Sequence, residues 1–228
     1  MSNKKNNFKL AFTLSEVLIT LGIIGVVAAM TIPNLIADAQ NKRMYAQLKA
    51  TQSILSNAIR LAEEEYGDMT GWDVKMEYSE ADAKAIAKVL KQYLKLALDC
   101  GTMDSEGKCS PKVRYKLLNG SSHSGNYYDN KKYYKVVLLN GSSIWWRSAQ
   151  ENEYKDYDRV AVFWIDLNGD RAPNQVGRDL FLYDYEKGAF RPQGAPGYHE
   201  EGTCNLSGPG WGCSYFVLQY GHMKYPKN

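Results

Sequence analysis

The sequence predicts an α+β fold in which a long N-terminal helix, its first half transmembrane, packs on a C-terminal globular domain with an antiparallel sheet. Two observations predict the helix: an uncharged apolar run, and a helical spacing of apolar residues that continues directly beyond it. The third observation is a change to runs rich in β-branched and aromatic residues in the second half of the chain. These patterns divide the chain into a leader, an apolar and an amphipathic half of the helix, and a globular head: residues 1–11, 12–37, 38–66 and 67–228.

The apolar run from Val17 to Ala37 contains no charged residue and is long enough to cross a bilayer. The leader before it carries lysines and no acid, so we expect the N-terminus in the cytoplasm and the head outside. Two other interpretations fit the same pattern: an ordinary secretory signal peptide cut near Ala29, and an uncleaved single-pass anchor. Glu16 argues against the signal peptide, because it interrupts the junction between the charged and apolar regions.

Beyond the apolar run, the helix is predicted to become amphipathic and to end at Tyr66, with Gly67 as the residue that follows the cap. Pro33 lies inside the run, where it removes a backbone hydrogen bond and predicts a kink. The apolar face recurs at steps of three or four residues, which is the spacing of one helical face. Its members are Met44, Leu48, Thr51, Leu55, Ile59 and Ala62.

The head is expected to begin with a second helix, capped by Ser79 and extending to about Leu98. Further on, Asn140–Gly141 predicts a two-residue hairpin turn, and residues 119–132 are expected to form an exposed loop. A sheet of four to six antiparallel strands should result, with the most apolar strand, residues 159–167, at its centre. The expected strands are residues 133–139, 143–147, 159–167, 179–185, 189–191 and 214–220.

The four cysteines fall in two pairs, each with eight residues between its members. Glycine, serine and proline fill both intervening loops, which favours the local disulfides Cys100–Cys109 and Cys204–Cys213. In an oxidising compartment, each would contribute roughly 2–3 kcal/mol by restricting the unfolded chain. Four cysteines allow three pairings, and four reduced thiols are the alternative.

Net charge and motifs exclude several classes of function. The formal charge of +3 equals the contribution of Lys4, Lys5 and Lys9, so the chain without its leader carries no excess of basic side chains, and no nucleic-acid partner is predicted. No HExxH, GxSxG, P-loop or dinucleotide motif is present, and the three histidines are scattered. We therefore expect no enzymatic activity.

A candidate cation site follows the central strand. Asp166, Asn168 and Asp170 occupy the first, third and fifth positions of a loop that resembles an EF-hand loop, which favours calcium. Asp179 could close such a site from the next strand, and Asp158 is a further candidate. The match is partial, because Arg171 stands where glycine is expected. A plain Asx/Gly turn is the alternative, and it is the one we prefer.

The segment Phe12-Thr-Leu-Ser-Glu16-Val-Leu-Ile-Thr-Leu-Gly-Ile-Ile-Gly-Val-Val-Ala-Ala resembles the N-terminal signature of type IV pilins and of the pseudopilins of type II secretion. The resemblance covers about residues 4–40. It consists of a basic leader, the small residue Ala11 before Phe12, an acid as the fifth residue from Phe12, an apolar run and Pro33. The departure is Ala11 itself, where most of the family has glycine.

The resemblance implies a pilin-like fold and a structural subunit of a type IV pilus or a type II secretion pseudopilus. A prepilin peptidase would cut between Ala11 and Phe12 and methylate the new Phe12 amine. Glu16 of one subunit would neutralise that amine in a neighbour, and the helix near Pro33 could unwind on assembly. Implied partners are sister subunits, an inner-membrane assembly platform, its ATPase and membrane lipid. The location would be the bacterial inner membrane, then the periplasm or cell exterior within a filament.

Three alternatives stay open at this stage. Glu16 could cap the N-terminus of its own helix. Some pseudopilins bind calcium in a comparable C-terminal loop, so a structural calcium ion is a possible cofactor. The chain could instead be a membrane-anchored or secreted binding protein, such as an adhesin or a glycan-binding module. Tryptophan could support glycan binding, although core and hairpin packing is the preferred interpretation for Trp145, Trp146, Trp164 and Trp211.

Overall fold

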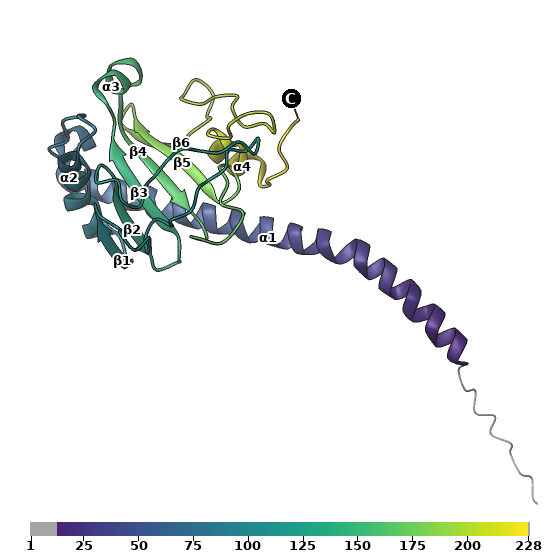
Figure 1. The fold of residues 1–228 in the computed structure, drawn as a ribbon. Helices are drawn as coiled ribbons and strands as arrows, with labels where there is room; N and C mark the ends of the chain where they lie inside the picture. The colour runs from purple at the N-terminus through teal and green to yellow at the C-terminus, as the bar shows by residue number, and fades with distance from the viewer. Residues whose placement is uncertain (1–12, 228) are drawn as a thin grey trace, which may run out of the picture. The chain divides into compact units, whose positions relative to one another are not determined.

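Helix α1 (Leu14–Tyr66) is the first element of the structure, a computed structural model that describes residues 13–227. The described chain divides after Asn41 into two compact units, the apolar part of α1 and the head. Figure 1 shows the elements of the head in order along the chain. They are α2 (Glu80–Leu90), β1 (Leu96–Gly101), β2 (Tyr134–Leu138), β3 (Ser143–Ser148), α3 (Glu151–Tyr157), β4 (Arg159–Asp166), β5 (Leu180–Glu186), β6 (Ala189–Pro192) and α4 (Cys213–Tyr220).

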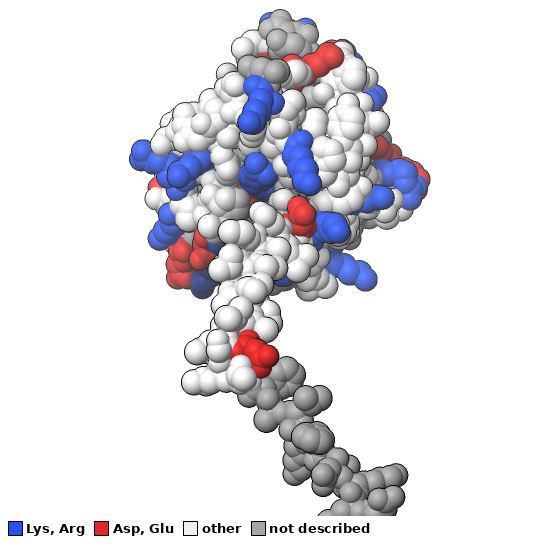
Figure 2. Space-filling model, turned by 90° about the vertical axis from the view of Figure 1, so that its right-hand side faces the viewer, with Lys and Arg blue, Asp and Glu red and all other residues white. Residues whose placement is uncertain are grey.

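The first unit is an apolar helical segment whose side chains are exposed. The side chains of Leu14, Met30 and Leu35 are each 70% exposed or more. Within residues 13–227, α1 is the one helix long and apolar enough to cross a membrane. Its exposure excludes the role of a buried core helix. Figure 2 shows the part of α1 next to the grey residues as uncharged surface, apart from one acidic group.

The second part of α1 belongs to the head and is amphipathic, as predicted. Its buried residues lie on one face, and polar contacts fix its position beside the sheet. Gln47 donates to the carbonyl oxygen of Leu167 at 2.6 Å, and Thr51 is hydrogen-bonded to Ser142 at 2.9 Å. The helix ends at Tyr66, and Gly67 follows in the left-handed conformation that is common after a helix C-terminus. The buried face consists of Leu48, Thr51, Leu55, Ala58, Ile59 and Ala62.

The six strands form one antiparallel sheet in the order β1-β2-β3-β4-β5-β6, so that each strand pairs with its neighbour in sequence. The predicted fold class is therefore confirmed: a long N-terminal helix and an antiparallel sheet in an α+β arrangement. Strand β4 lies inside the sheet and is buried along its whole length, as expected of the most apolar strand.

Both faces of the sheet are buried at β4 and β5, which explains why these strands carry apolar or aromatic residues at most positions. Trp146, Phe163 and Tyr183 point to the first face, in the core that includes α1 and α2. Trp145 and Trp164 point to the second face, where loops cover them. Of the four tryptophans considered above, Trp145, Trp146 and Trp164 are buried and Trp211 is partly exposed, so packing is confirmed for three.

Two turns show how glycine shapes the sheet. The β2–β3 hairpin is confirmed, but its loop has three residues rather than two, because Leu138 donates to Ser142 and accepts from Gly141. Gly141 takes the left-handed conformation there, as in a type I turn followed by a bulge. Between β5 and β6, Lys187 and Gly188 both have positive φ, which is the two-residue turn typical of a tight hairpin.

The expectation of a helix to about Leu98 was wrong. Helix α2 ends at Leu90, a 3-10 turn follows at Lys91–Tyr93, and the chain then enters β1. The Ser79 cap is confirmed, because its hydroxyl accepts from the amide of Asp82. Strand β1 pairs with β2 along one edge of the sheet, and this non-local pairing overrides the local helical spacing.

Two further expectations were wrong. Residues 214–220 form α4 rather than a last strand, and Gly221 ends this helix in the left-handed conformation. Residues 119–132 are not simply an exposed loop, because Tyr127 is buried at 5% exposure in the core on the second face of the sheet. Helix α3 was not predicted at all.

Candidate functional site

The first turn of α1 is closed by three reciprocal hydrogen bonds between Thr13 and Glu16. The amide and the hydroxyl of Thr13 each donate to Glu16 Oε2 at 2.8 Å, and the amide of Glu16 donates to the Thr13 hydroxyl at 3.2 Å. This is a capping box, in which a Thr and a Glu three residues apart satisfy the free N–H groups of a helix start. Within the described chain Glu16 therefore caps its own helix, the alternative that the sequence left open.

The capping box uses one oxygen of Glu16. Its Oε1 has no hydrogen bond to residues 13–227, and the side chain is exposed. The carboxylate thus keeps acceptor capacity for a donor from outside this chain. The predicted cleavage and methylation residues, Ala11 and Phe12, lie outside the described residues.

Pro33 lies inside α1, and helical structure is assigned on both sides of it. The residues around it are exposed, which fits a segment whose surroundings come from lipid or from other helices. The kink and the unwinding predicted for this position stay predictions.

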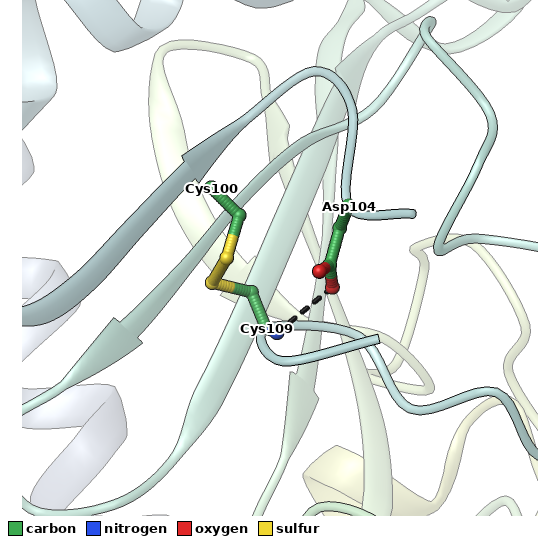
Figure 3. A group of neighbouring side chains, drawn as sticks. All are labelled: Cys100, Asp104 and Cys109. Atoms are coloured by element: carbon green, nitrogen blue, oxygen red, sulfur yellow. Dashed lines mark hydrogen bonds between the residues drawn. A yellow bond between two sulfur atoms is a disulfide. The ribbon is translucent and has the colours of Figure 1, made fainter. Parts of the chain in front are cut away.

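The two predicted disulfides, Cys100–Cys109 and Cys204–Cys213, are both present, and no free cysteine is found among the described residues. Figure 3 shows the first of them beside Asp104. Cys100, Asp104 and Cys109 are the one trio of Cys, His, Asp or Glu side chains in the described chain close enough to hold a metal ion. A disulfide sulfur is not a thiolate, so this trio lacks the ligands that a metal would require.

Asp104 instead organises the loop that the first disulfide closes. It is 5% exposed, and its carboxylate accepts from three backbone amides, those of Lys108, Cys109 and Ser110, at 2.7–2.8 Å. These hydrogen bonds replace those that the carboxylate would make to water, and without them its burial would be energetically costly. The group is structural, and the sequence did not single out Asp104.

The candidate calcium loop brings together only part of its predicted set. Asp166 and Asp179 are both fully buried, and burial raises the pKa of each, to about 7 for Asp166, where the charge of Asp179 adds to it, and to about 6 for Asp179. The side chain of Asp170 is exposed. Asp158 precedes β4 at the end opposite to Asp166, so it cannot join the group.

The carboxylate oxygens of this loop already accept hydrogen bonds. Asp166 Oδ1 accepts from the amides of Asn168 and Gly169, Asp166 Oδ2 accepts from the hydroxyl of Tyr115, and Asp179 accepts from the amides of Asn174 and Gln175. This is the Asx-type turn that the sequence favoured. Two buried amide oxygens, Asn168 Oδ1 and Asn174 Oδ1, lack a partner in the described chain. A cation would depend on these two atoms, but the predicted EF-hand-like ligand set does not fit.

The described chain is thus an α+β protein with a pilin-like layout: an exposed apolar helix whose second part is built into a disulfide-bonded head with an antiparallel sheet. By its sequence it belongs to a family of unknown function, DUF6613, which matches residues 34–204. That match covers the amphipathic part of α1 and most of the head. It begins after the quoted segment from Phe12 to Ala29, within the range of about residues 4–40 that the resemblance covers. No curated protein and no solved structure matches the chain.

Proposed function

We propose that this chain is a structural subunit of a type IV pilus or of a type II secretion pseudopilus. It is inserted in the bacterial inner membrane by the apolar part of α1, with its N-terminus in the cytoplasm and its head outside. A prepilin peptidase removes residues 1–11 and methylates Phe12. The mature subunit then joins sister subunits by packing of α1, with the help of an assembly platform and its ATPase.

One observation carries this proposal: a single helix serves as both the apolar segment and the backbone of the head. Residues 14–36 expose apolar side chains in every direction, whereas Leu48 and Leu55, farther along the same helix, are fully buried in the head. Exposing an apolar surface of this size to water is energetically unfavourable, so lipid or neighbouring helices must cover it. A helix satisfies its own backbone and can exchange one apolar environment for the other.

Two further features support the proposal. The disulfides fit a head that folds in an oxidising compartment, outside the cytoplasm. The free oxygen of Glu16 fits the role of accepting a cationic amine from a neighbouring subunit, where low dielectric strengthens the attraction. The signature resemblance supplies the identity of that amine, Phe12.

The experiment is an intact-mass measurement of the full chain produced in a bacterium with and without a prepilin peptidase. We expect peptidase-dependent loss of residues 1–11 and one added methyl group on Phe12. The matched variant Ala11→Leu places a bulky residue before the cut and should accumulate uncleaved, whereas Ala11→Gly should be processed. The processed chain should then appear in sheared filaments.

Two results would overturn the proposal. Peptidase-independent cleavage near Ala29 would indicate an ordinary signal peptide, and an uncut chain in the presence of the peptidase would indicate a simple anchor. Either result would favour the alternative, a membrane-anchored or secreted binding protein.

A further inference from the structure

A cavity of about 560 Å³ opens on the second face of the sheet, the face turned away from α1 and α2. Val162 and Trp164 of β4 and Leu182 of β5 contribute to its floor. The loops that cover this face form its walls. Its volume falls within the range of roughly 300–1,000 Å³ that is usual for small-molecule sites.

Aromatic rings line this cavity from several separate segments. Tyr78 precedes α2, His123 belongs to the loop after β1, and Trp211 belongs to the loop before α4. The rings of Trp211 and His123 meet edge to face, with centroids 4.9 Å apart, and both side chains are partly exposed. Such rings offer flat apolar faces that a ligand can cover.

The two arginines of the cavity are already paired with carboxylates, and the other acid of its lining, Glu200, lies 3.6 Å from His199. Arg147 makes two hydrogen bonds of 2.8 Å to Glu153, and Arg159 makes a third to the same carboxylate at 3.0 Å. Arg159 also lies 3.6 Å from a carboxylate oxygen of Asp184. Because a charged ligand would have to displace or face these pairs after losing its own water, the cavity favours a neutral ligand.

The aromatic faces are also unsuited to a cationic ligand. The guanidinium carbon of Arg147 lies 4.9 Å from the ring centre of Tyr78 and 5.7 Å from that of Trp164. Lys132 Nζ lies 4.2 Å from the ring centre of Tyr78. These cations occupy the ring positions that an ammonium ligand would seek.

Planar amide side chains surround the aromatic walls. Asn126 and Gln150 are exposed beside the cavity, and Asn130 is partly exposed. Each amide offers both donors and an acceptor, which matches hydroxyl groups better than it matches a charge. Apolar ring faces combined with amide groups suit a ligand that has C–H faces and hydroxyl edges.

The second disulfide positions Trp211. Cys213 closes the loop two residues after Trp211, and the amide of Gly212 donates to the hydroxyl of Thr203 at 2.8 Å. The backbone at position 212 passes so close to the carbonyl oxygen of Glu200 that a Cβ atom would clash with it, so this position requires glycine. The loop is therefore held against its neighbour, and the indole of Trp211 is fixed at the cavity.

From these contacts we infer that the cavity binds a neutral saccharide, stacked on Trp211 and hydrogen-bonded by the surrounding amides. This site lies wholly in the head, so the inference does not depend on filament assembly. It gives the subunit a ligand-binding surface in addition to its structural role.

The test is isothermal titration of the full chain with maltose, lactose and diacetylchitobiose at millimolar concentration. The chain is kept in a zwitterionic detergent, because glucoside and maltoside detergents carry candidate ligands themselves. Glucuronate and choline serve as charged probes. We expect saturable binding of at least one of the three neutral disaccharides and weaker binding of both charged probes.

Variants tie that binding to the cavity. Trp211→Ala should weaken the affinity at least about tenfold, equivalent to about 1.4 kcal/mol, whereas Trp211→Phe should keep part of it. Gln150→Ala removes an exposed amide without touching the core and should also weaken binding. Tyr220→Ala removes an aromatic ring that is 60% exposed on α4, outside the cavity, and should bind as the wild type does.

Three results would overturn the inference. They are no binding of any of the three neutral disaccharides by the folded wild-type chain, unchanged affinity in both Trp211→Ala and Gln150→Ala, and binding of glucuronate or choline as tight as that of the disaccharides. Thermal unfolding of each variant checks that it is folded. If Trp211→Ala does not fold, Gln150→Ala and Trp211→Phe carry the test.

Discussion

The carboxylate of Glu153 holds the guanidinium of Arg147 in a two-point ion pair, with both N–O distances at 2.8 Å. The same carboxylate accepts from the backbone amide of Gln150 at 2.7 Å, so that it also closes the start of α3. Burial alone would raise the pKa of Glu153, but Arg147, the Gln150 amide and the charge of Arg159 together outweigh burial and lower this pKa to about 2. One side chain thereby connects α3 to β3 and β4.

Glu153→Gln should destabilise the head by about 3 kcal/mol at pH 7, because it leaves two guanidinium groups with less opposing charge in a buried place. Because the pKa of Glu153 is lowered on folding, its contribution is present above about pH 4.5 and is lost as the pH falls toward 2. The difference between wild type and variant should therefore shrink over that window. Urea unfolding of the full chain, followed by tryptophan fluorescence, measures it.

Glu151→Gln is the matched control for this prediction. Its carboxylate pairs with Lys155 on the same helix, but both side chains are at least 66% exposed. Exposed pairs contribute little to stability, because solvent screens their attraction. An equal loss in the two variants would show that burial of the Glu153 pair does not matter.

Glu16→Gln separates the two roles of this residue. Glutamine can replace glutamate in a capping box, so helix capping and membrane insertion should be retained. The negative charge is lost, so pairing with the amine of a neighbouring subunit should be abolished, and the variant should be absent from sheared filaments. Glu16→Ala should lose both capping and pairing.

Immunoblotting of membrane and filament fractions measures both outcomes. Normal incorporation of Glu16→Gln into filaments would contradict the pairing role while leaving the capping box intact. Loss of the variant from the membrane fraction would show that the charge acts earlier, in insertion.

The long helix and the disulfides could be predicted from the sequence because both depend on local pattern. An uncharged run, a helical spacing and a cap residue determine where α1 ends, and short loops bring Cys100 near Cys109 and Cys204 near Cys213. The capping box of Thr13 and Glu16 was available from their spacing, and the sequence raised it only as an alternative.

Of the features that were missed, β1 and the cavity depend on distant partners, whereas α4 does not. Residues 214–220 have strand-like composition, yet they form a helix that buries Ser214 and Val217, a helical spacing that the sequence did contain. Strand β1 forms because its backbone pairs with the free edge of β2, which is distant in sequence. The cavity unites Tyr78, His123, Arg147 and Trp211 from four separate segments, and no local pattern signals such a meeting.

Calcium should leave the thermal unfolding midpoint of the full chain unchanged relative to a chelator. The oxygens of Asp166 and Asp179 already accept hydrogen bonds, and Asp170 points to solvent. If calcium did bind, a free calcium concentration of a hundred times the dissociation constant would stabilise the fold by about 2.7 kcal/mol, which is readily measured. A rise with calcium that Asp179→Asn removes would contradict this expectation and restore the cation site.

The two disulfides should differ in their effect on saccharide binding. Each closes a loop of the same length, so the double variants Cys100→Ala/Cys109→Ala and Cys204→Ala/Cys213→Ala should both lose stability, by roughly 2–3 kcal/mol. Only the second pair flanks Trp211, and only its removal frees that indole from the cavity. We therefore expect disaccharide affinity to fall in the second double variant and to persist in the first, as measured by titration at a temperature where both are folded. Equal affinity in the two would show that the cavity does not depend on the position of Trp211.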